Sequence, residues 1–224
     1  MKGMDGILTG IETHHLVPWQ GGVQLHRDVI EPLTTLCEKA REAGFRLEIA
    51  SGFRSFDRQL AIWNAKARGE RQVLDKQGKP IAVGSLDDEA LLWAILQWSA
   101  LPGTSRHHWG TDMDIWDSAA VDNAYCLKLE VAEYTDNGPF APLIAWLDGQ
   151  VEGGTTDFYF PYARYQGGVM PEPWHISYQP LASGFAQRLT ADKVAGVIGE
   201  SPICLKRQIL ENIEQIMDRF VQSC

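Results

Sequence analysis

The order of apolar patterns along the chain constrains its fold more than any other feature of the sequence. Apolar residues recur at helical spacing over about 26–43, 57–67, 86–100 and 201–222. Strand patterns lie at 45–49, 114–116, 158–162 and 174–178. The segments do not alternate strictly as strand, helix and strand. This order favours an α+β fold, in which helices flank a mostly antiparallel central sheet.

Local signals predict where three of these helices begin. Pro32 confines the start of the first helix. Ser85 is the expected cap of the third helix, and Asp88 stands three residues later in a capping-box arrangement. For the last helix, Ser201 supplies the cap and Pro202 takes the first helical position. We therefore expect one amphipathic closing helix over about 201–222.

Length and composition predict a single domain over residues 1–224. The chain has 224 residues, of which 45% are hydrophobic, so it can bury a core without disulfides. No repeat, low-complexity tract or linker divides it. The cysteines are scattered and form no CxxC pair, which argues against a disulfide framework or a thiolate metal site; they are Cys37, Cys126, Cys204 and Cys224.

The balance of charge argues against two classes of partner. The chain has 29 acidic and 20 basic residues, a formal net charge of -9 at pH 7. This charge repels phosphate backbones and anionic lipid headgroups, so we expect no nucleic-acid partner. We find no run of about 18 apolar residues and no apolar core of about 7–15 residues near the N-terminus. We therefore expect no membrane span and a cytoplasmic protein, or a periplasmic one if a leader has been removed.

One block of the sequence combines histidine, glycine and aspartate. His107 and Asp114 lie seven positions apart, on either side of Gly110. The glycine permits a turn, so His107 can stand on a loop and Asp114 on the following strand, with both side chains directed toward one point. Taken alone, such a pair more often marks a surface loop than a metal site.

A second block places a carboxylate three positions before a histidine. Glu172 and His175 are separated by Pro173 and Trp174. Together the two blocks offer two histidines and one aspartate as zinc ligands, and one further carboxylate. A catalytic zinc takes three protein ligands and lowers the pKa of its water to about 7, so Glu172 is the expected base. The alternative is a turn that leads into a strand anchored by Trp174, and spacing alone does not join the two blocks in space.

The combined motifs resemble those of a known family. They are Ser-Gly-Phe-Arg-Ser at 51–55, Ser-x-His-x-x-Gly-x-x-x-Asp at 105–114 and Glu-x-Trp-His at 172–175. Their order and spacing are similar to those of zinc D-alanyl-D-alanine carboxypeptidases and dipeptidases of the vancomycin-resistance type (VanY-type). The resemblance covers about 47–178, most of the chain. It implies the hedgehog/DD-peptidase fold, an α+β architecture that agrees with the order of elements above.

The resemblance also implies a metal centre and a base. His107, Asp114 and His175 correspond to the ligands of one zinc ion. Glu172 corresponds to the general base that takes a proton from the attacking water.

Three further residues take roles from the resemblance. Arg54 corresponds to the arginine that stabilises charge on the tetrahedral intermediate. A fixed guanidinium suits this task, since water attacking a peptide carbonyl creates an oxyanion. Ser105 and Gln59 correspond to positions that line the substrate pocket, where a C-terminal carboxylate needs donors.

Asp112 departs from the family pattern. The family usually carries a small residue, commonly alanine, two positions before the aspartate ligand. On an extended strand Asp112 and Asp114 face the same side, so Asp112 can approach the metal or the residues around it. The alternative is a bulged strand in which Asp112 bonds to a loop.

The remaining histidines are expected outside the metal centre. His108 should face away from its neighbouring ligand, as a packing residue or as a support for the residues around the metal, because adjacent strand residues point to opposite sides. His14, His15 and His26 have no partnering acid and are expected on the surface.

The sequence thus predicts a zinc metallopeptidase that hydrolyses a peptide bond near a D-amino acid. The expected substrate is the terminal D-Ala-D-Ala of a peptidoglycan stem peptide or precursor, and the substrate class comes from the resemblance alone. One alternative is a non-catalytic zinc domain that binds peptides or a partner. Another is an L-alanyl-D-glutamate endopeptidase of the phage-lysin type. A binding domain has no need of Glu172 or Arg54, so their presence favours the enzyme.

Overall fold

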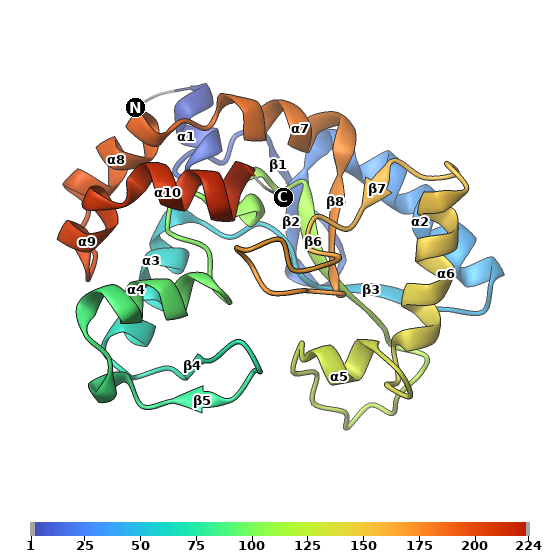
Figure 1. Ribbon diagram of the computed structural model, residues 1–224. Helices are drawn as coiled ribbons and strands as arrows, with labels where there is room; N and C mark the ends of the chain where they lie inside the picture. Colours follow the sequence, from blue (N-terminus) through green and yellow to red (C-terminus); the bar gives the residue numbers. More distant parts are fainter. Residues whose placement is uncertain (1–2, 223–224) are drawn as a thin grey trace.

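The central sheet has four strands in the order β3, β6, β8, β7 (Figure 1). These are β3 (Leu47–Ser51), β6 (Asp112–Asp117), β8 (His175–Tyr178) and β7 (Phe158–Tyr159). All neighbouring strands are antiparallel in the computed structural model, which describes residues 3–222. The expected α+β fold with an antiparallel central sheet is confirmed.

Side chains of β6 alternate between an apolar and a polar face of the sheet. Met113 and Ile115 join one hydrophobic cluster, together with Ile176 of strand β8. Asp112 and Asp114 occupy the alternate positions, so they face the other side. All five side chains are buried. The alternation therefore buries two carboxylates on one face while it builds a core on the other.

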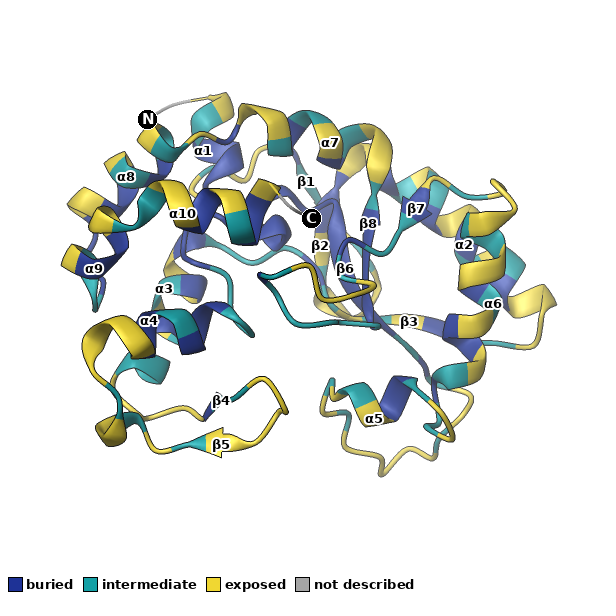
Figure 2. Ribbon diagram, in the orientation of Figure 1, coloured by how far each residue is buried: buried dark blue, intermediate teal, exposed yellow. Residues whose placement is uncertain are grey.

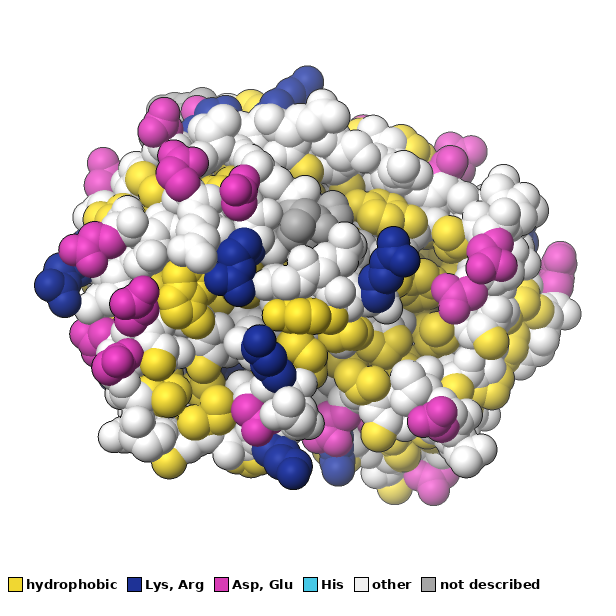
Figure 3. Space-filling model, viewed as in Figure 1, with side chains coloured by type: hydrophobic (Ala, Val, Ile, Leu, Met, Phe, Trp, Pro, Cys, Tyr) yellow, Lys and Arg dark blue, Asp and Glu magenta, His cyan; other side chains and the backbone are white. Residues whose placement is uncertain are grey.

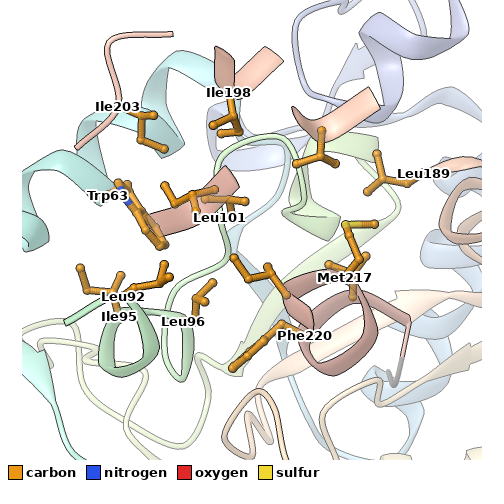
Figure 4. Close-up of a cluster of buried hydrophobic side chains, with 14 of the residues drawn as sticks. Trp63, Leu92, Ile95, Leu96, Leu101, Leu189, Ile198, Ile203, Met217 and Phe220 are labelled. Carbon is orange, nitrogen blue, oxygen red and sulfur yellow. The ribbon is translucent and has the colours of Figure 1, made fainter. Parts of the chain in front are cut away.

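The helices form two groups, and the first covers the apolar face of the sheet. The apolar face packs against α2 (Ile30–Glu42) and α6 (Ala141–Glu152), on the right in Figure 1. A second hydrophobic cluster (Figure 4) draws on α1 (Met4–Leu8) and on six further helices. They are α3 (Phe56–Ala67), α4 (Asp88–Leu96), α7 (Gln179–Arg188), α8 (Ala191–Glu200), α9 (Lys206–Glu211) and α10 (Ile213–Met217). Buried residues follow the inward sides of these helices (Figure 2).

Shorter elements connect these layers. Two hairpins are formed by β1 (Leu16–Pro18) with β2 (Gln24–His26) and by β4 (Val73–Leu74) with β5 (Pro80–Ile81). Two short helices are α1 (Met4–Leu8) and α5 (Val131–Tyr134). Single turns are η1 (Gln20–Gly22), η2 (Arg27–Val29), η3 (Val83–Ser85), η4 (Arg106–Trp109) and the π-helical η5 (Asp218–Gln222).

The predicted cap of the third helix is wrong. Ser85 belongs to the turn η3, where its hydroxyl donates to the carbonyl of Ala82 at 2.7 Å. Asp87 caps α4 instead, because its Oδ1 accepts the backbone N–H of Ala90 at 2.8 Å. A carboxylate two positions later thus outcompetes the serine, which already has a local partner.

The single closing helix over 201–222 is also wrong. Residues 201–205 form a non-helical connection, which Asn64 of α3 holds by accepting from the N–H of Cys204 at 2.8 Å and donating to the carbonyl of Pro202 at 3.1 Å. Further along, Asn212 separates α9 from α10, and its amide donates to the carbonyl of Gln208 at 2.9 Å. Tertiary bonds and a side chain that bonds to the backbone therefore divide the amphipathic segment.

Two further observations concern cysteines and membrane spans. Cys37, Cys126 and Cys204 are free thiols, and Cys224 lies outside the described residues. Within residues 3–222, every helix is too short or too polar to cross a bilayer.

The expected surface position is wrong for His15 and His26. They are only 5% and 8% exposed, whereas His14 is exposed. The β1–β2 hairpin brings the rings of His15 and His26 to 5.3 Å, and the ring of Phe53 lies edge-on to His15 at 6.4 Å. Burial, assisted by the nearby His26 and His14, lowers the pKa of His15 from 6.5 to about 4.

Burial of His15 predicts sensitivity to acid. Its pKa is lower in the folded than in the unfolded state, so its contribution is complete above pH 6.5 and is lost as the pH falls toward 4. In His15→Leu, the free energy of unfolding should fall less between pH 7 and 4.5, by roughly 2–3 kcal/mol. Urea denaturation at both pH values measures this, with the exposed His14→Ala as control. Parallel pH profiles for wild type and His15→Leu would contradict the account.

Candidate metal centre

Strand pairing brings two of the predicted ligands together. Asp114 of β6 is the direct cross-strand partner of His175 of β8, and on its other side it pairs with Ser51 of β3. Side chains that are opposite in an antiparallel pair lie on the same face of the sheet, with Cβ atoms about 4.5–5.5 Å apart. The polar face of the sheet thus presents a carboxylate and an imidazole side by side.

His107 reaches the same point from the turn η4. This turn ends at Gly110, whose φ of 70° is in the left-handed region. A Cβ there would lie only 2.7 Å from the backbone nitrogen of His26, so only glycine fits. His107 Nδ1 lies 2.8 Å from the carbonyl oxygen of Gly52, to which it donates. This bond leaves Nε2 of His107 free to accept a cation.

The three donor atoms have the spacing of a metal site. His107 Nε2 lies 3.5 Å from Asp114 Oδ2, and His175 Nδ1 lies 3.4 Å from Asp114 Oδ1. One ligand atom from each of these residues lies within 4.8 Å of the others. A tetrahedral zinc with bonds of about 2.0–2.2 Å separates its ligands by about 3.3–3.6 Å. The distances therefore fit a divalent cation without large rearrangement.

One buried atom of this set lacks a hydrogen-bond partner. His175 is 2% exposed, and its Nδ1 makes no hydrogen bond. A buried polar atom without a partner costs free energy, and a cation bound at Nδ1 would remove that cost. The donor set, two imidazoles and one carboxylate, is also a set that zinc prefers.

The charges of the centre couple metal binding to pH. Burial alone would raise the pKa of Asp114, but His107 and His175 hold it well below its usual range. Burial would lower the pKa of His175, yet the carboxylates of Asp112, Asp114 and Glu172 around its ring raise that pKa well above 6.5. A cation must therefore displace a proton from His175, and its affinity should fall as the pH is lowered.

Glu172 lies beside the donor set. The backbone N–H of His175 donates to the carbonyl of Glu172 at 3.0 Å, and this tight turn brings the carboxylate back to the centre. Its Oε2 lies 3.5 Å from His175 Nδ1, and the side chain is 17% exposed. Glu172 is thus adjacent to the metal-binding atoms and open to the cavity, as a base requires.

Arg54 is locked to the segment that carries His107. Its backbone N–H donates to the carbonyl of His107 at 3.1 Å, and its own carbonyl lies 2.6 Å from Nδ1 of His108. Burial lowers the pKa of Arg54, while Asp114 and Glu172 oppose that shift through their charges. The guanidinium thus lies within range of the charges of both acids, and all three residues line the same cavity.

Gln59 supports Arg54 from behind. Its Oε1 accepts from Nη1 of Arg54 at 3.1 Å, and its Nε2 donates to the carbonyl of Ala100 at 2.7 Å. The Gln59 side chain is 1% exposed, and both ends of its amide are engaged. Gln59 was expected to line the substrate pocket, but it is not among the residues that line the cavity, and its amide instead bonds to the guanidinium of Arg54.

A cavity of about 190 Å³ opens onto these groups. Arg54, Ser105 and Glu172 line it together with the three candidate ligands. Beyond Trp98 and Trp174 it continues into a larger groove of about 1180 Å³ between the β4–β5 hairpin and the 129–139 segment. Figure 3 shows hydrophobic side chains gathered across the middle of this face of the molecule.

Asp112 is buried next to the candidate ligands. Its Oδ1 lies 3.1 Å from His175 Nε2, on the side of the ring opposite Nδ1. Regular pairing of Asp112 with Ser177 excludes a bulge at this point, and the irregularity lies in β3 between Ile49 and Ser51. Without a bulge, Asp112 contacts His175, one of the candidate ligands, and also bonds to Arg106 on the turn η4, so each of the two readings is met in part.

His108 is buried as expected, although it lies on the turn η4 and not on a strand. Its side chain is fully buried, and Nε2 accepts from the N–H of Gly103 at 3.0 Å. Burial lowers the pKa of His108 to about 3, so the ring stays neutral.

Two contributors were not found in the sequence. The ring of Tyr162 lies edge-on to His175, with centroids 4.9 Å apart, and also lines the cavity. Arg106 pairs with Asp112, Nε to Oδ1, at 2.7 Å. The sequence did contain a signal for the Arg106–Asp112 pair, because these two residues of opposite charge flank the turn at Gly110. We find no comparable signal for Tyr162.

Comparison with known proteins decides the family. The sequence model of the VanY family, described as D-alanyl-D-alanine carboxypeptidase, matches residues 22–181. The chain belongs to the VanY family. A relative in Haemophilus influenzae, an uncharacterised protein, is 40% identical over 105 residues, which are 45% of this chain and 72% of that protein.

Solved structures of VanY-type and related enzymes share the fold. A mutant of the vancomycin-resistance D,D-pentapeptidase VanY in complex with Zn(II) has a TM-score of 0.50 at 22% identity, covering 87% of this chain and 88% of that chain. The structure of VanYB in complex with D-alanine-D-alanine has a TM-score of 0.52 at 21% identity, and the match covers 88% of this chain and 89% of that chain. The structure of the LD-carboxypeptidase LdcB has a TM-score of 0.55 at 19% identity, and the match covers 93% of this chain and 88% of that chain.

Family membership and the geometry agree on a broad activity. The VanY family match identifies the protein as a peptidase related to peptidoglycan. The site just described contains a candidate metal centre and a carboxylate beside it, which hydrolytic peptidases of this kind need.

The donor set predicts one tightly bound zinc ion per chain. His107→Ala should lose tight binding, because two remaining ligands rarely hold the metal. Zinc content after dialysis, and competition with a chromophoric chelator, measure the effect. His14→Ala, which changes an exposed histidine outside the centre, should bind zinc like the wild type. Full occupancy in His107→Ala would remove His107 from the metal centre.

Proposed function

We propose that the protein is a zinc-dependent D-alanyl-D-alanine carboxypeptidase that acts on peptidoglycan stem peptides or their precursors. The observation that carries this proposal is the arrangement of His107, Asp114 and His175 around one point, with Glu172 and Arg54 on the wall of the same cavity. Family membership supports the substrate class. Two solved structures with the same fold also support it: one is a VanY mutant in complex with Zn(II), and the other is VanYB in complex with D-alanine-D-alanine.

Zinc held by His107, Asp114 and His175 would supply an acidified water, with a pKa lowered to about 7. Glu172 accepts a proton from the attacking water, since its carboxylate lies next to His175 and faces the cavity. The same group then delivers the proton to the leaving amine.

Arg54 acts on the charge that develops during attack. Its guanidinium is fixed from two sides, by Gln59 at 3.1 Å and by Ser51 Oγ at 3.3 Å. A donor that is already oriented stabilises the oxyanion without reorganisation. Gln59 acts through Arg54 as a positioning residue.

Ser105 is the proposed donor to the substrate. Its side chain is 2% exposed and lines the cavity. A hydroxyl on this wall can bind the terminal carboxylate of a peptide, which gives the substrate its orientation.

The size of the cavity favours a chain rather than a free dipeptide as substrate. The cavity at the metal centre measures about 190 Å³, and the adjoining groove about 1180 Å³. The two share Trp98, Leu129 and Trp174. A terminal dipeptide can occupy the small cavity, while the preceding residues of a stem peptide follow the groove.

The test is hydrolysis of a stem pentapeptide that ends in D-Ala-D-Ala, with the products identified by mass spectrometry. The zinc-loaded wild type should release D-alanine. Glu172→Gln should lower turnover by about 10²–10⁴-fold, since the amide cannot take the proton. Its zinc content should stay unchanged, because Glu172 is outside the donor set.

In the same assay, Arg54→Ala should lower turnover by about a hundredfold or more and retain its zinc. Turnover of Glu172→Gln equal to the wild type would refute the assigned base. Cleavage between L-Ala and D-Glu would replace the carboxypeptidase assignment with that of an endopeptidase. Zinc binding without any hydrolysis would favour a non-catalytic binding domain.

A further inference from the structure

The two ring nitrogens of His175 face two different carboxylates. Nδ1 lies 3.4 Å from Asp114, and Nε2 lies 3.1 Å from Asp112. Asp114 belongs to the metal-binding set, whereas Asp112 lies on the far side of the ring. We propose that Asp112 is a positioning residue of the metal centre, which accepts the Nε2 proton of His175 and so leaves Nδ1 as the ligand atom, and that Arg106 holds Asp112 in place. The inference rests on the metal centre of the proposed function.

The position of the proton follows from what each group can do. A carboxylate accepts hydrogen bonds and does not donate, so at 3.1 Å Nε2 of His175 is the donor to Asp112. Once a cation has displaced the second proton, the neutral imidazole carries one proton, at Nε2, and Nδ1 presents its lone pair on the side of Asp114 and Glu172. A carboxylate behind a metal-binding histidine fixes the tautomer and ring orientation, and it makes the ligand more basic.

Asp112 can hold this position because its own environment is closed and complete. Its side chain is 0% exposed. Oδ1 accepts from Nε of Arg106 at 2.7 Å as well as from His175, and Oδ2 accepts from the hydroxyl of Thr111 at 2.7 Å. Both oxygens are thus engaged, and a nearby guanidinium balances the buried charge.

Arg106 is itself fixed by three partners. Its Nη2 donates to the hydroxyl of Tyr159 at 2.7 Å and to Ser177 Oγ at 2.8 Å, while Nε donates to Asp112. The guanidinium also lies over the ring of Trp109 at 5.0 Å. The carboxylate therefore rests on a rigid support that β7 and β8 supply.

The ion pair also ties together two segments that carry ligands. Arg106 directly precedes His107 on the turn η4, and Asp112 stands two positions before Asp114 on β6. A small residue at 112, the usual residue in the family resembled, could neither pair with Arg106 nor accept from His175. Where the family usually has a small residue, this chain thus has Asp112, whose charge Arg106 stabilises and whose carboxylate accepts a hydrogen bond from His175.

A purely structural ion pair would give a different result from a positioning residue. Loss of a structural pair lowers the stability of the fold but leaves the zinc affinity of the folded protein unchanged. Loss of a positioning residue lowers zinc affinity even in a well-folded variant, typically by about 10–100-fold. Zinc affinity, measured together with the free energy of unfolding, separates these two roles.

The experiment compares four proteins by competition with a chromophoric chelator at fixed pH. Asp112→Asn keeps the size of the side chain and removes its charge. Asp112→Ala combined with Arg106→Met removes both charges, so that no unpaired arginine stays buried. Asp117→Asn is the matched control, since Asp117 is a buried aspartate on the same strand that caps backbone N–H groups of Arg46 and Ala119.

We expect zinc affinity to fall about tenfold or more in Asp112→Asn and in the double variant, and to stay at the wild-type level in Asp117→Asn. If Asp112→Asn does not fold, the zinc affinity of the double variant alone tests the inference. Wild-type affinity in the folded double variant would overturn the inference and leave the proposed function intact. Failure of the wild type to bind zinc would instead overturn the proposed function, and this inference with it.

Discussion

The site depends on the antiparallel pairing of β6 with β8. This pairing makes Asp114 and His175 direct neighbours, although they are far apart in the sequence. A slip of one residue in the register would turn one strand's side chains to the opposite face and separate the carboxylate from the imidazole. The apolar partners Met113, Ile115 and Ile176 resist such a slip, because their burial against α2 and α6 requires the observed register. The packing of one face of the sheet therefore fixes the chemistry of the other.

The polar face of the sheet carries buried charged groups, and their burial determines its electrostatics. Asp112, Asp114 and His175 are buried, so their interactions with each other are stronger than they would be in water. Unpaired charges at such depth would be costly, and each of these groups has a charged or hydrogen-bonding partner. The network orients the donor atoms before any cation arrives, and Glu172 and Arg54 stand at its open side. An arrangement organised in advance is what hydrolysis at a metal centre requires.

The sequence predicted the classes of element and the residues of the site better than it predicted local boundaries. The α+β fold and antiparallel sheet followed from apolar periodicity, which reports burial directly. The ligand set was indicated by residue types around Gly110 and by the family resemblance, but only the register of β6 and β8 joins the two blocks. The helix cap moved from Ser85 to Asp87 because two capping side chains competed nearby. The closing helix was divided by bonds from Asn64, which lies far away in sequence, and no local pattern reveals such bonds. The burial of His15 could not be predicted, because it depends on the β1–β2 hairpin and the sequence around His15 contains no pattern that indicates this hairpin.

The central claim is that His107, Asp114 and His175 share one divalent cation. Anomalous diffraction at the zinc absorption edge, from crystals of the zinc-loaded protein, tests it most directly. The account predicts one strong peak at about 2.0–2.2 Å from His107 Nε2, His175 Nδ1 and a carboxylate oxygen of Asp114. A zinc peak bound by other residues, or two imidazoles too far apart to contact the same peak, would contradict it.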